Sequence, residues 1–287
     1  MYKYESKKLP KSTTEFTLTI PKEDIKKEAV TAFKRLQQEL VVDGFRKGQV
    51  PSDIARKHIT QERTYQDMIQ AILPKIYEEI VKKESLRPIV SPKVDLLSAK
   101  EGEDWKIKIV VCEKPSIELG DYKKAIKELK SKHKADDIWV PGKEKNPKDD
   151  SDKKSHLINE VLEALMKSSK IEIPDLIMEE EVNHRLTKLV DDIQKIGLTT
   201  DSYLKSKNLT MDSLKAQFRK EIEDTYKLEF ILSEVADKEN IKVEKDELDK
   251  LFVNIKDEKE KKLAEANSYY YATILRKQKT IDFLIAL

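Results

Sequence analysis

The stretch DGFRKGQVP, residues 43–51, lies between two segments that both have the apolar periodicity of amphipathic helices. It holds two of the six glycines of the chain, a phenylalanine, two adjacent cations and a proline. Gly44 and Gly48 permit the positive φ angles of a tight loop, and Pro51 sets the start of the next helix. The stretch therefore predicts a corner between two helices. Its exposed tip comprises Phe45, Arg46 and Lys47.

The region around this corner is positively charged. Residues 44–63 have a net charge of +3, and residues 1–120 have a net charge of +4, from 23 lysines and arginines against 19 acidic residues. A solvated turn is the ordinary interpretation of such a corner. An aromatic ring beside two cations favours a second interpretation, in which the tip docks on phosphate-rich RNA or in the groove of a protein.

Strands are predicted on both sides of the helical segments. Residues 14–20 alternate apolar residues with threonines, and residues 105–111 place apolar residues on one face and lysines on the other, which is the period of a half-buried strand. Residues 1–9 are expected to pair with the first of these strands. Residues 89–99 are expected to form an antiparallel pair with the second.

Two helices are predicted between these strands. The first begins at Pro21 and ends near Gly44, and the second begins after Pro51, with Ser52 and Asp53 as caps. A proline at position 74 predicts a kink or a break in the second helix. Strands, helices and strands in this order predict an α+β domain over residues 1–114, with an antiparallel sheet and long helices.

The rest of the chain is predicted to be helical almost to its end. Residues 141–155 contain no aliphatic side chain and are rich in charge, so they predict a flexible linker or loop. We expect a linker over residues 115–155 and an extended all-α domain over residues 156–287. Two similar joints, at residues 168–181 and 237–250, predict elbows between helices that build arms instead of one closed bundle.

The sequence indicates no enzyme mechanism. It has no glycine-rich phosphate loop, and its four histidines are scattered without metal-ligand spacing, so we expect no catalytic residue, no metal and no cofactor. Cys112 is the only cysteine, and no apolar stretch has the length of a signal peptide or a membrane span. We expect a cytoplasmic protein that does not bind a membrane.

The C-terminal helix is strongly apolar and permits two interpretations. Its apolar stripe is that of a helix docked in the core of the second domain. Alternatively, part of the stripe is exposed and binds apolar segments of a client protein. The candidate client-binding residues are Tyr269, Tyr270, Ile274 and Phe283.

The segment GFRKGQVP closely resembles the signature of the trigger factor family of ribosome-associated chaperones. Similar matches are RPIVSPKVDLL and VVCEKPSIELGDY in the first half, and VLEALMKSSKIEIPDLIMEEEV, SEVADKENIKVEKDEL and LRKQKTIDFLIAL in the second. The resemblance implies an N-terminal ribosome-binding domain and a C-terminal SurA-like domain that cradles nascent or unfolded chains without ATP. It implies docking near the tunnel exit, on ribosomal protein and RNA, by the residues Gly44, Phe45, Arg46, Lys47, Gly48, Gln49, Val50 and Pro51.

Two departures from the family pattern change these expectations. Gln49 stands where the family usually has a cation, which predicts weaker or more salt-sensitive ribosome binding. The prolyl-isomerase domain that the family usually inserts is expected to be absent, because a domain of roughly 100 residues cannot fit between the two halves. A residual prolyl isomerase and a nonspecific RNA-binding protein are the alternatives. The resemblance leaves a dimer off the ribosome open.

Overall fold

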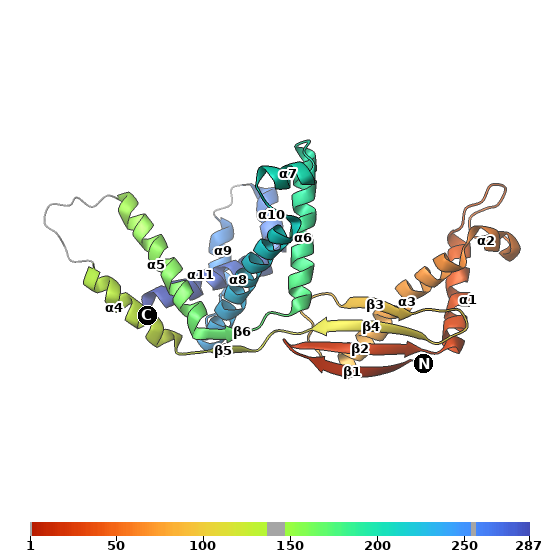
Figure 1. The fold of residues 1–287 in the computed structure, drawn as a ribbon, viewed down its shortest axis with the longest axis horizontal. Coiled ribbons are helices and arrows are strands. Elements are labelled where there is room, and N and C mark those ends of the chain that lie inside the picture. The colour runs from red at the N-terminus through yellow and green to blue at the C-terminus, as the bar shows by residue number, and fades with distance from the viewer. Residues whose placement is uncertain (1, 137–146, 254–256) are drawn as a thin grey trace. The chain divides into compact units, whose positions relative to one another are not determined.

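The protein consists of two compact units, Met1–Lys114 and Pro115–Leu287. Their structure is a computed structural model that describes residues 2–136, 147–253 and 257–287 (Figure 1). The first unit contains a four-stranded sheet and three helices, and the second is mainly helical. The predicted fold class, an α+β unit followed by a helical one, is confirmed.

The sheet of the first unit is antiparallel throughout. Its strands are β1 (Lys3–Leu9), β2 (Thr13–Ile20), β3 (Lys93–Ser98) and β4 (Trp105–Cys112), and they lie in the order β1-β2-β4-β3. The central pair places Leu18 opposite Ile107 and Phe16 opposite Ile109, and all four side chains are buried. The four predicted strands and both predicted pairings are therefore confirmed.

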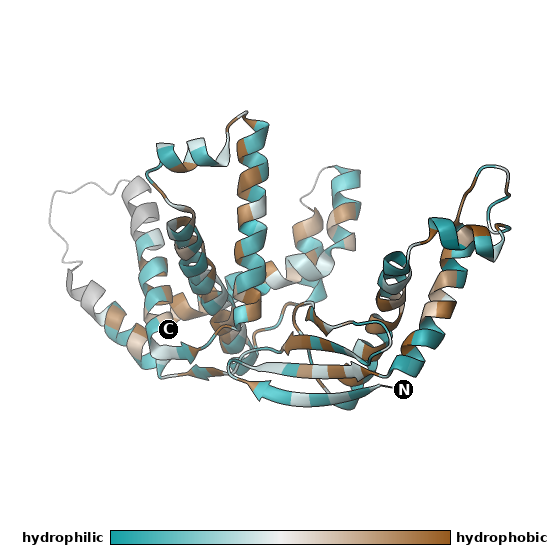
Figure 2. Ribbon diagram, turned by 45° about the vertical axis from the view of Figure 1, so that its right-hand side comes forward, coloured by the Kyte–Doolittle hydropathy of each residue, from teal (hydrophilic) through white to brown (hydrophobic). Residues whose placement is uncertain are grey.

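Two helices cover one face of this sheet. They are α1 (Lys22–Glu39) and α3 (Gln61–Lys83), which pack side by side. The short helix α2 (Ser52–His58) lies between them in the chain and belongs to a separate apolar cluster. Figure 2 shows apolar residues recurring in stripes along the helices and alternating with hydrophilic residues in the strands. The stripes close a core between sheet and helices, made of Phe16, Leu18, Ile20, Ile25, Ala32, Met68, Ile76, Ile80, Trp105, Ile107, Ile109 and Val111.

The helix boundaries differ from the prediction in two ways. The predicted second helix is divided at Ile59, and the side chain of Thr60 caps α3 by accepting a hydrogen bond from the backbone N–H of Arg63 at 3.2 Å. Ser52 and Asp53 were expected as caps, but they lie in the first turn of α2, whose N-cap position is Pro51. Of the predicted kink or break at Pro74, the break is wrong, because α3 continues through this residue with buried residues on both sides. The kink stays a prediction.

The second unit is organised around a short antiparallel pair, β5 (Ile117–Leu119) and β6 (Ser169–Ile171). The backbone N–H of Gly120 donates to the carbonyl oxygen of Ser168 at 3.1 Å. A Cβ atom at Gly120 would lie 2.2 Å from that oxygen, so this close approach requires glycine.

Four helices build the core of this unit: α4 (Tyr122–Asp136), α5 (Pro147–Ser168), α8 (Met211–Lys238) and α11 (Ser268–Ala286). Each contributes apolar side chains that are almost completely buried. The fully buried members are Tyr122, Ile126, Val161, Leu165, Ile231, Leu232, Val235 and Leu284.

The predicted linker over residues 115–155 differs from the structure. Residues 117–119 form β5, residues 122–136 form α4, and Tyr122 and Ile126 are 1% and 0% exposed in the core of the second unit. The last residues of the predicted linker, from Pro147 onward, belong to α5. The predicted loop at residues 141–146 lies outside the described residues.

The remaining helices are α6 (Asp175–Lys195), α7 (Thr200–Ser206), α9 (Lys245–Val253) and α10 (Glu258–Ala266). Helices α6 and α8 pack together, and α7 joins them at one end, capped by Thr199. The two predicted joints are not equivalent. The first contains β6, whereas residues 241–244 of the second form no strand.

A polar cluster ties α4 to the end of α8. The Tyr122 hydroxyl donates to Glu239 Oε1 at 2.6 Å, and Lys123 Nζ lies 2.7 Å from the same atom. Burial and the bond to this carboxylate raise the pKa of Tyr122. The hydrogen bonds from Lys123 and from Tyr122 lower the pKa of Glu239.

We predict that Tyr122→Phe lowers the free energy of unfolding of the second unit by about 1.5 kcal/mol at pH 7, the net value of a hydrogen bond to a charged group. Because the pKa of Tyr122 is raised, its contribution is present below its ordinary pKa of about 10 and is lost as the pH rises above it. Urea unfolding followed by circular dichroism at pH 7 and above pH 10 measures both effects. Tyr203→Phe, which removes a half-buried hydroxyl of α7 outside this cluster, is the control.

Candidate functional sites

The corner between α1 and α2 is built from two consecutive turns. The backbone N–H of Phe45 donates to the carbonyl of Val42 at 3.0 Å, and that of Gln49 donates to the carbonyl of Arg46 at 2.9 Å. Gly44 and Gly48 have φ angles of 89° and 79°. These values confirm the positive φ angles that the sequence predicts for both glycines.

A small apolar cluster holds this corner in place. Val50 is 2% exposed and packs with Leu36 of α1, Ala55 of α2 and Ile59, apart from the core that covers the sheet. The side chain of Gln37 reaches back across the corner, where its Nε2 donates to the carbonyl of Val50 at 2.7 Å. The loop is therefore anchored at its C-terminal end by apolar contacts and by a hydrogen bond.

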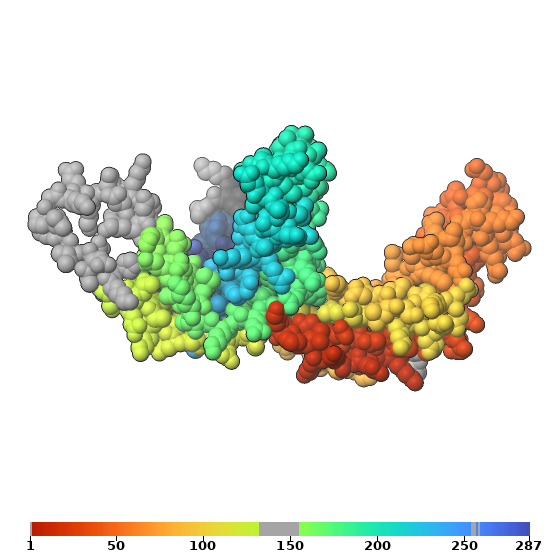
Figure 3. All heavy atoms as spheres, viewed as in Figure 1, coloured from red at the N-terminus to blue at the C-terminus, as the bar shows by residue number. Residues whose placement is uncertain are grey.

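The outer surface of the corner is aromatic and basic. Phe45 is 38% exposed, and Arg46, Lys47 and Gln49 are exposed beside it. Among the predicted docking residues, Val50 is buried and supports the loop from within. The space-filling view shows this corner, in orange, projecting away from the sheet of its own unit (Figure 3).

The C-terminal helix α11 is buried in part and exposed in part, so each interpretation of its sequence holds for one end of the helix. Leu284 is fully buried, and Phe283 packs partly buried against the same core, with Lys123 Nζ 5.8 Å from its ring centre. Tyr269 and Tyr270 are 87% and 64% exposed. The helix is thus docked by its last turns and open at its first.

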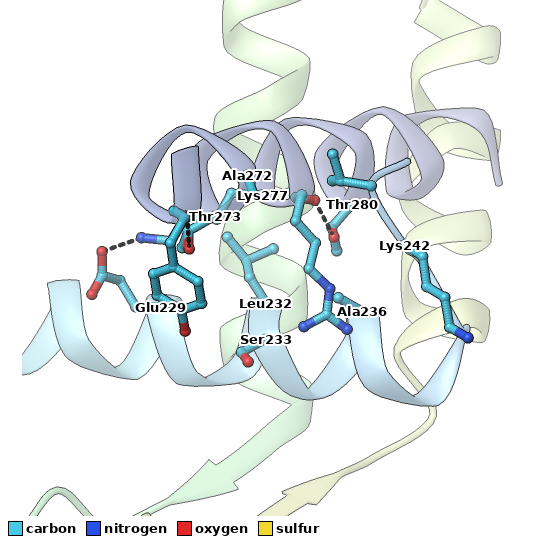
Figure 4. Close-up of a pocket in the computed structure, with 12 residues that line it drawn as sticks. Glu229, Leu232, Ser233, Ala236, Lys242, Ala272, Thr273, Lys277 and Thr280 are labelled. Atoms are coloured by element: carbon cyan, nitrogen blue, oxygen red, sulfur yellow. Dashed lines mark hydrogen bonds and ion pairs between the residues drawn. The ribbon is translucent and has the colours of Figure 1, made fainter. Parts of the chain in front are cut away.

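The open end of α11 borders a groove against α8, with a cavity volume of about 440 Å³ (Figure 4). Leu232 and Ala236 of α8 and Ala272 of α11 form an apolar floor, and Tyr269 lies at the end. Two charge pairs lie on the rim, Lys277 with Glu229 and Arg276 Nη2 with Asp237 Oδ1 at 2.6 Å, and Lys242 also lines the groove. The groove therefore offers apolar surface beside two ion pairs and one further cation.

A second groove, of about 560 Å³, lies on the neighbouring face of α11. It is bordered by Leu263 of α10, which is 66% exposed, and by Tyr270 and Tyr271. The ring of Tyr271 packs edge-on against Phe252 at 5.5 Å, so it supports this face. Tyr269 and Tyr270 are about 100° apart around the helix axis, which assigns them to different grooves.

The predicted client-binding residues are therefore divided by the structure. Tyr269, Tyr270 and Ile274 are exposed, and Phe283 lies on the packed side of the helix. Leu263 was not identified from the sequence, because a single leucine in a charged helix has no periodic signal. We call Leu263, Tyr269, Tyr270 and Ile274 the exposed apolar surface of α10 and α11.

In the described part of the chain, the histidines and the cysteine form no arrangement that is typical of a catalytic site. His58, His156 and His184 are exposed, the side chain of His133 lies outside the described residues, and Cys112 is buried. The described residues hold no group of three or more histidine, cysteine or acidic side chains able to bind a metal ion. Among them, too, no helix has the length and apolar character needed to cross a bilayer.

Two family models match the chain almost end to end. The model for "Bacterial trigger factor protein (TF)" matches residues 2–140, and the model for its C-terminus matches residues 144–286. Proteins named "Trigger factor" from Streptococcus pneumoniae are similar over 107 residues: that of strain Hungary19A-6 is 43% identical and that of strain D39 / NCTC 7466 is 42% identical. Each match covers 37% of this chain and a quarter (25%) of the length of the relative.

A solved structure described as "Promiscuous Substrate Recognition in Folding and Assembly Activities of the Trigger Factor Chaperone" has a similar fold. The TM-score is 0.64, and the alignment covers 99% of each chain at 15% sequence identity. At this identity the likeness concerns the fold.

The two glycines of the corner allow a matched test of its backbone. A Cβ atom added at Gly48 would lie 3.3 Å from the carbonyl oxygen of Gln38. A Cβ atom added at Gly44 would have no neighbouring atom within 4 Å. We predict that Gly44→Ala weakens the closed loop by about 1 kcal/mol, the cost of a positive φ angle, and that Gly48→Ala weakens it more. Faster amide hydrogen exchange over residues 44–50 measures the change, and equal rates in both variants would contradict the contact at Gly48.

Proposed function

The chain belongs to the trigger factor family, and on that premise we propose that it is an ATP-independent chaperone that docks on the ribosome near the tunnel exit and shields nascent chains. One observation carries the proposal: an exposed aromatic ring and two cations lie on a loop that is anchored by a buried core of its own. We place this activity in the cytoplasm.

The first unit supplies the location. Phe45, Arg46 and Lys47 require no rearrangement to meet a flat partner, because the two turns and the buried Val50 already fix the loop. Cations position a protein on RNA phosphates, and an aromatic ring adds apolar contact with a protein groove. A surface of both RNA and protein near the tunnel exit therefore suits this tip.

The second unit supplies the shielding surface. Exposed apolar side chains on α10 and α11 border two open grooves, and two ion pairs lie on the rim of the first. Such a surface accepts apolar segments of many sequences, because it presents few polar groups that demand a particular partner. Shallow contacts also permit release without a fuel such as ATP.

We propose that the protein does not catalyse prolyl isomerisation. The family models leave only residues 141–143 between them. A catalytic domain of roughly 100 residues has no room there. The nonspecific RNA-binding alternative is less favourable, because the net charge of the chain is only +2 and its second unit exposes apolar grooves.

We predict that the triple variant Phe45→Ala, Arg46→Ala, Lys47→Ala co-sediments with ribosomes much less than the unmodified protein, because it removes the ring and both cations of the tip. The loss of two phosphate contacts also makes the negative slope of log affinity against log salt shallower by about 1.5. Gln49→Lys is expected to add one contact and to steepen that slope by about 0.8, so of the two effects expected for Gln49 we keep weaker binding, because fewer phosphate contacts reduce salt sensitivity.

The control for this experiment removes two exposed cations elsewhere. Lys205→Ala with Lys207→Ala changes the net charge by the same amount on the second unit. This variant is expected to pellet like the unmodified protein. Pelleting of the tip variant at the unmodified level would exclude the tip as the docking site.

We predict that Tyr269→Ser with Tyr270→Ser reduces the suppression of client aggregation by at least about half in the absence of ribosomes. Both side chains are exposed, so the free energy of unfolding is expected to change by less than about 0.5 kcal/mol. Light scattering of a chemically unfolded client, diluted into each variant, measures the effect.

Val30→Ser is the matched control, since Val30 is an exposed apolar residue of α1 at 57%. It is expected to leave suppression unchanged. Equal suppression by the double tyrosine variant would show that clients do not use the exposed apolar surface of α10 and α11.

A further inference from the structure

The two edges of the sheet in the first unit differ in chemistry. Strand β1 carries three lysines and a glutamate in seven residues, the kind of charged edge that prevents pairing with another chain. Strand β3 has one neighbour in the described sheet, β4, and exposes Val94, Leu96 and Leu97 at 39%, 52% and 53%. The β3 edge therefore has fewer charges than the β1 edge, Lys93 and Asp95, and exposes more apolar surface.

The register shows that part of this exposed surface belongs to the core face. Val94 lies opposite Ile109 and Leu96 lies opposite Ile107, and both isoleucines are 1% exposed. Side chains that face each other across a strand pair point to the same side of the sheet. Helix α3 thus covers β4 and leaves the same face of β3 open.

A groove follows this uncovered margin between α3 and β3. Its cavity volume is about 450 Å³, and its apolar walls include Tyr65 and Ile69 of α3 and Leu96 of β3. Trp105 forms the floor, with its ring edge-on to that of Tyr65 at 4.8 Å. The groove is therefore a continuation of the core that is open at the sheet edge.

The charge of the groove is acidic. Glu62 and Glu101 line it, and none of its lining side chains is cationic. An occupant with a positive charge would therefore complement it.

We propose that β3 accepts an extended, apolar segment of an unfolded polypeptide as an additional strand, with a cationic side chain of that segment beside Glu62 and Glu101. The nature of this ligand rests on the proposed chaperone function. Alternate side chains of an added strand point to one face, so every second residue enters the groove while backbone hydrogen bonds provide sequence-independent affinity.

An irregularity in β3 limits the part of this strand to which the ligand segment can pair. The β3–β4 register shifts between Leu96 and Ser98, and such a bulge interrupts regular pairing. The regular part of the edge is residues 93–96. A second copy of this chain is a less favourable occupant, because pairing of two β3 strands would place two acidic grooves, each lined by Glu62 and Glu101, next to each other.

Amide hydrogen exchange of the full chain tests the proposal. The probe is a synthetic nine-residue peptide in which leucine or phenylalanine alternates with serine, and one serine is replaced by arginine. We expect it to slow exchange over residues 93–98 by about tenfold or more. The same peptide with N-methylated backbone nitrogens, or with glutamate in place of arginine, is expected to give little protection.

Two protein variants locate the effect. Leu96→Lys places a charge at the groove and is expected to abolish the protection, whereas Leu97→Lys, equally exposed and outside the groove lining, is expected to keep it. Exchange over residues 105–112 without peptide reports whether each variant keeps its sheet.

The outcomes separate this inference from the proposed function. Protection over residues 268–286 without protection over 93–98 would overturn the inference and leave the chaperone surface of the second unit intact. Protection over 93–98 alone would support the inference and contradict the assigned client surface. Equal protection by the N-methylated peptide, or protection that grows with protein concentration without peptide, would overturn strand addition by a client.

Discussion

The helices of the first unit extend beyond the sheet that they cover, and the rest of that unit depends on this mismatch. Ile25 and Ala32 of α1 face the sheet, whereas Leu36, on the next turn, belongs to the separate cluster around Val50. An 18-residue helix is about 27 Å long. Its overhanging end therefore needs a core of its own, and the buried Val50 of the corner supplies it.

The second unit contains only a short strand pair, and its core is built mainly by helices. One short strand pair, closed by the contact of Gly120 with Ser168, brings the beginning of the unit against the end of α5. Four helices then share a core, but α11 is buried only toward its end. The first turns expose Tyr269 because α8 offers it a groove with an apolar floor instead of a complementary ridge, and Tyr270 borders the second groove, beside α10.

Local patterns predicted the elements well, because strand alternation and turn glycines act within a few residues. The strands at residues 14–20 and 105–111 and the positive φ angles at the corner are examples. Tertiary choices were harder to predict. Residues 122–136 were assigned to the linker because the domain that usually follows them is missing. Their burial depends on partners in α5 and α8 that lie far away in sequence. The division of α11 into a docked and an open part likewise depends on where its neighbours end.

The position of Cys112 has a practical consequence for experiments on this molecule. It is the only cysteine of the chain, fully buried at the end of β4 and paired in register with Thr13. A buried thiol reacts with alkylating reagents only when the surrounding structure opens. The rate of its alkylation therefore measures how often the sheet of the first unit opens. A cysteine introduced on an exposed helix would react with a fluorescent label much faster, and Cys112 would not compete for the label.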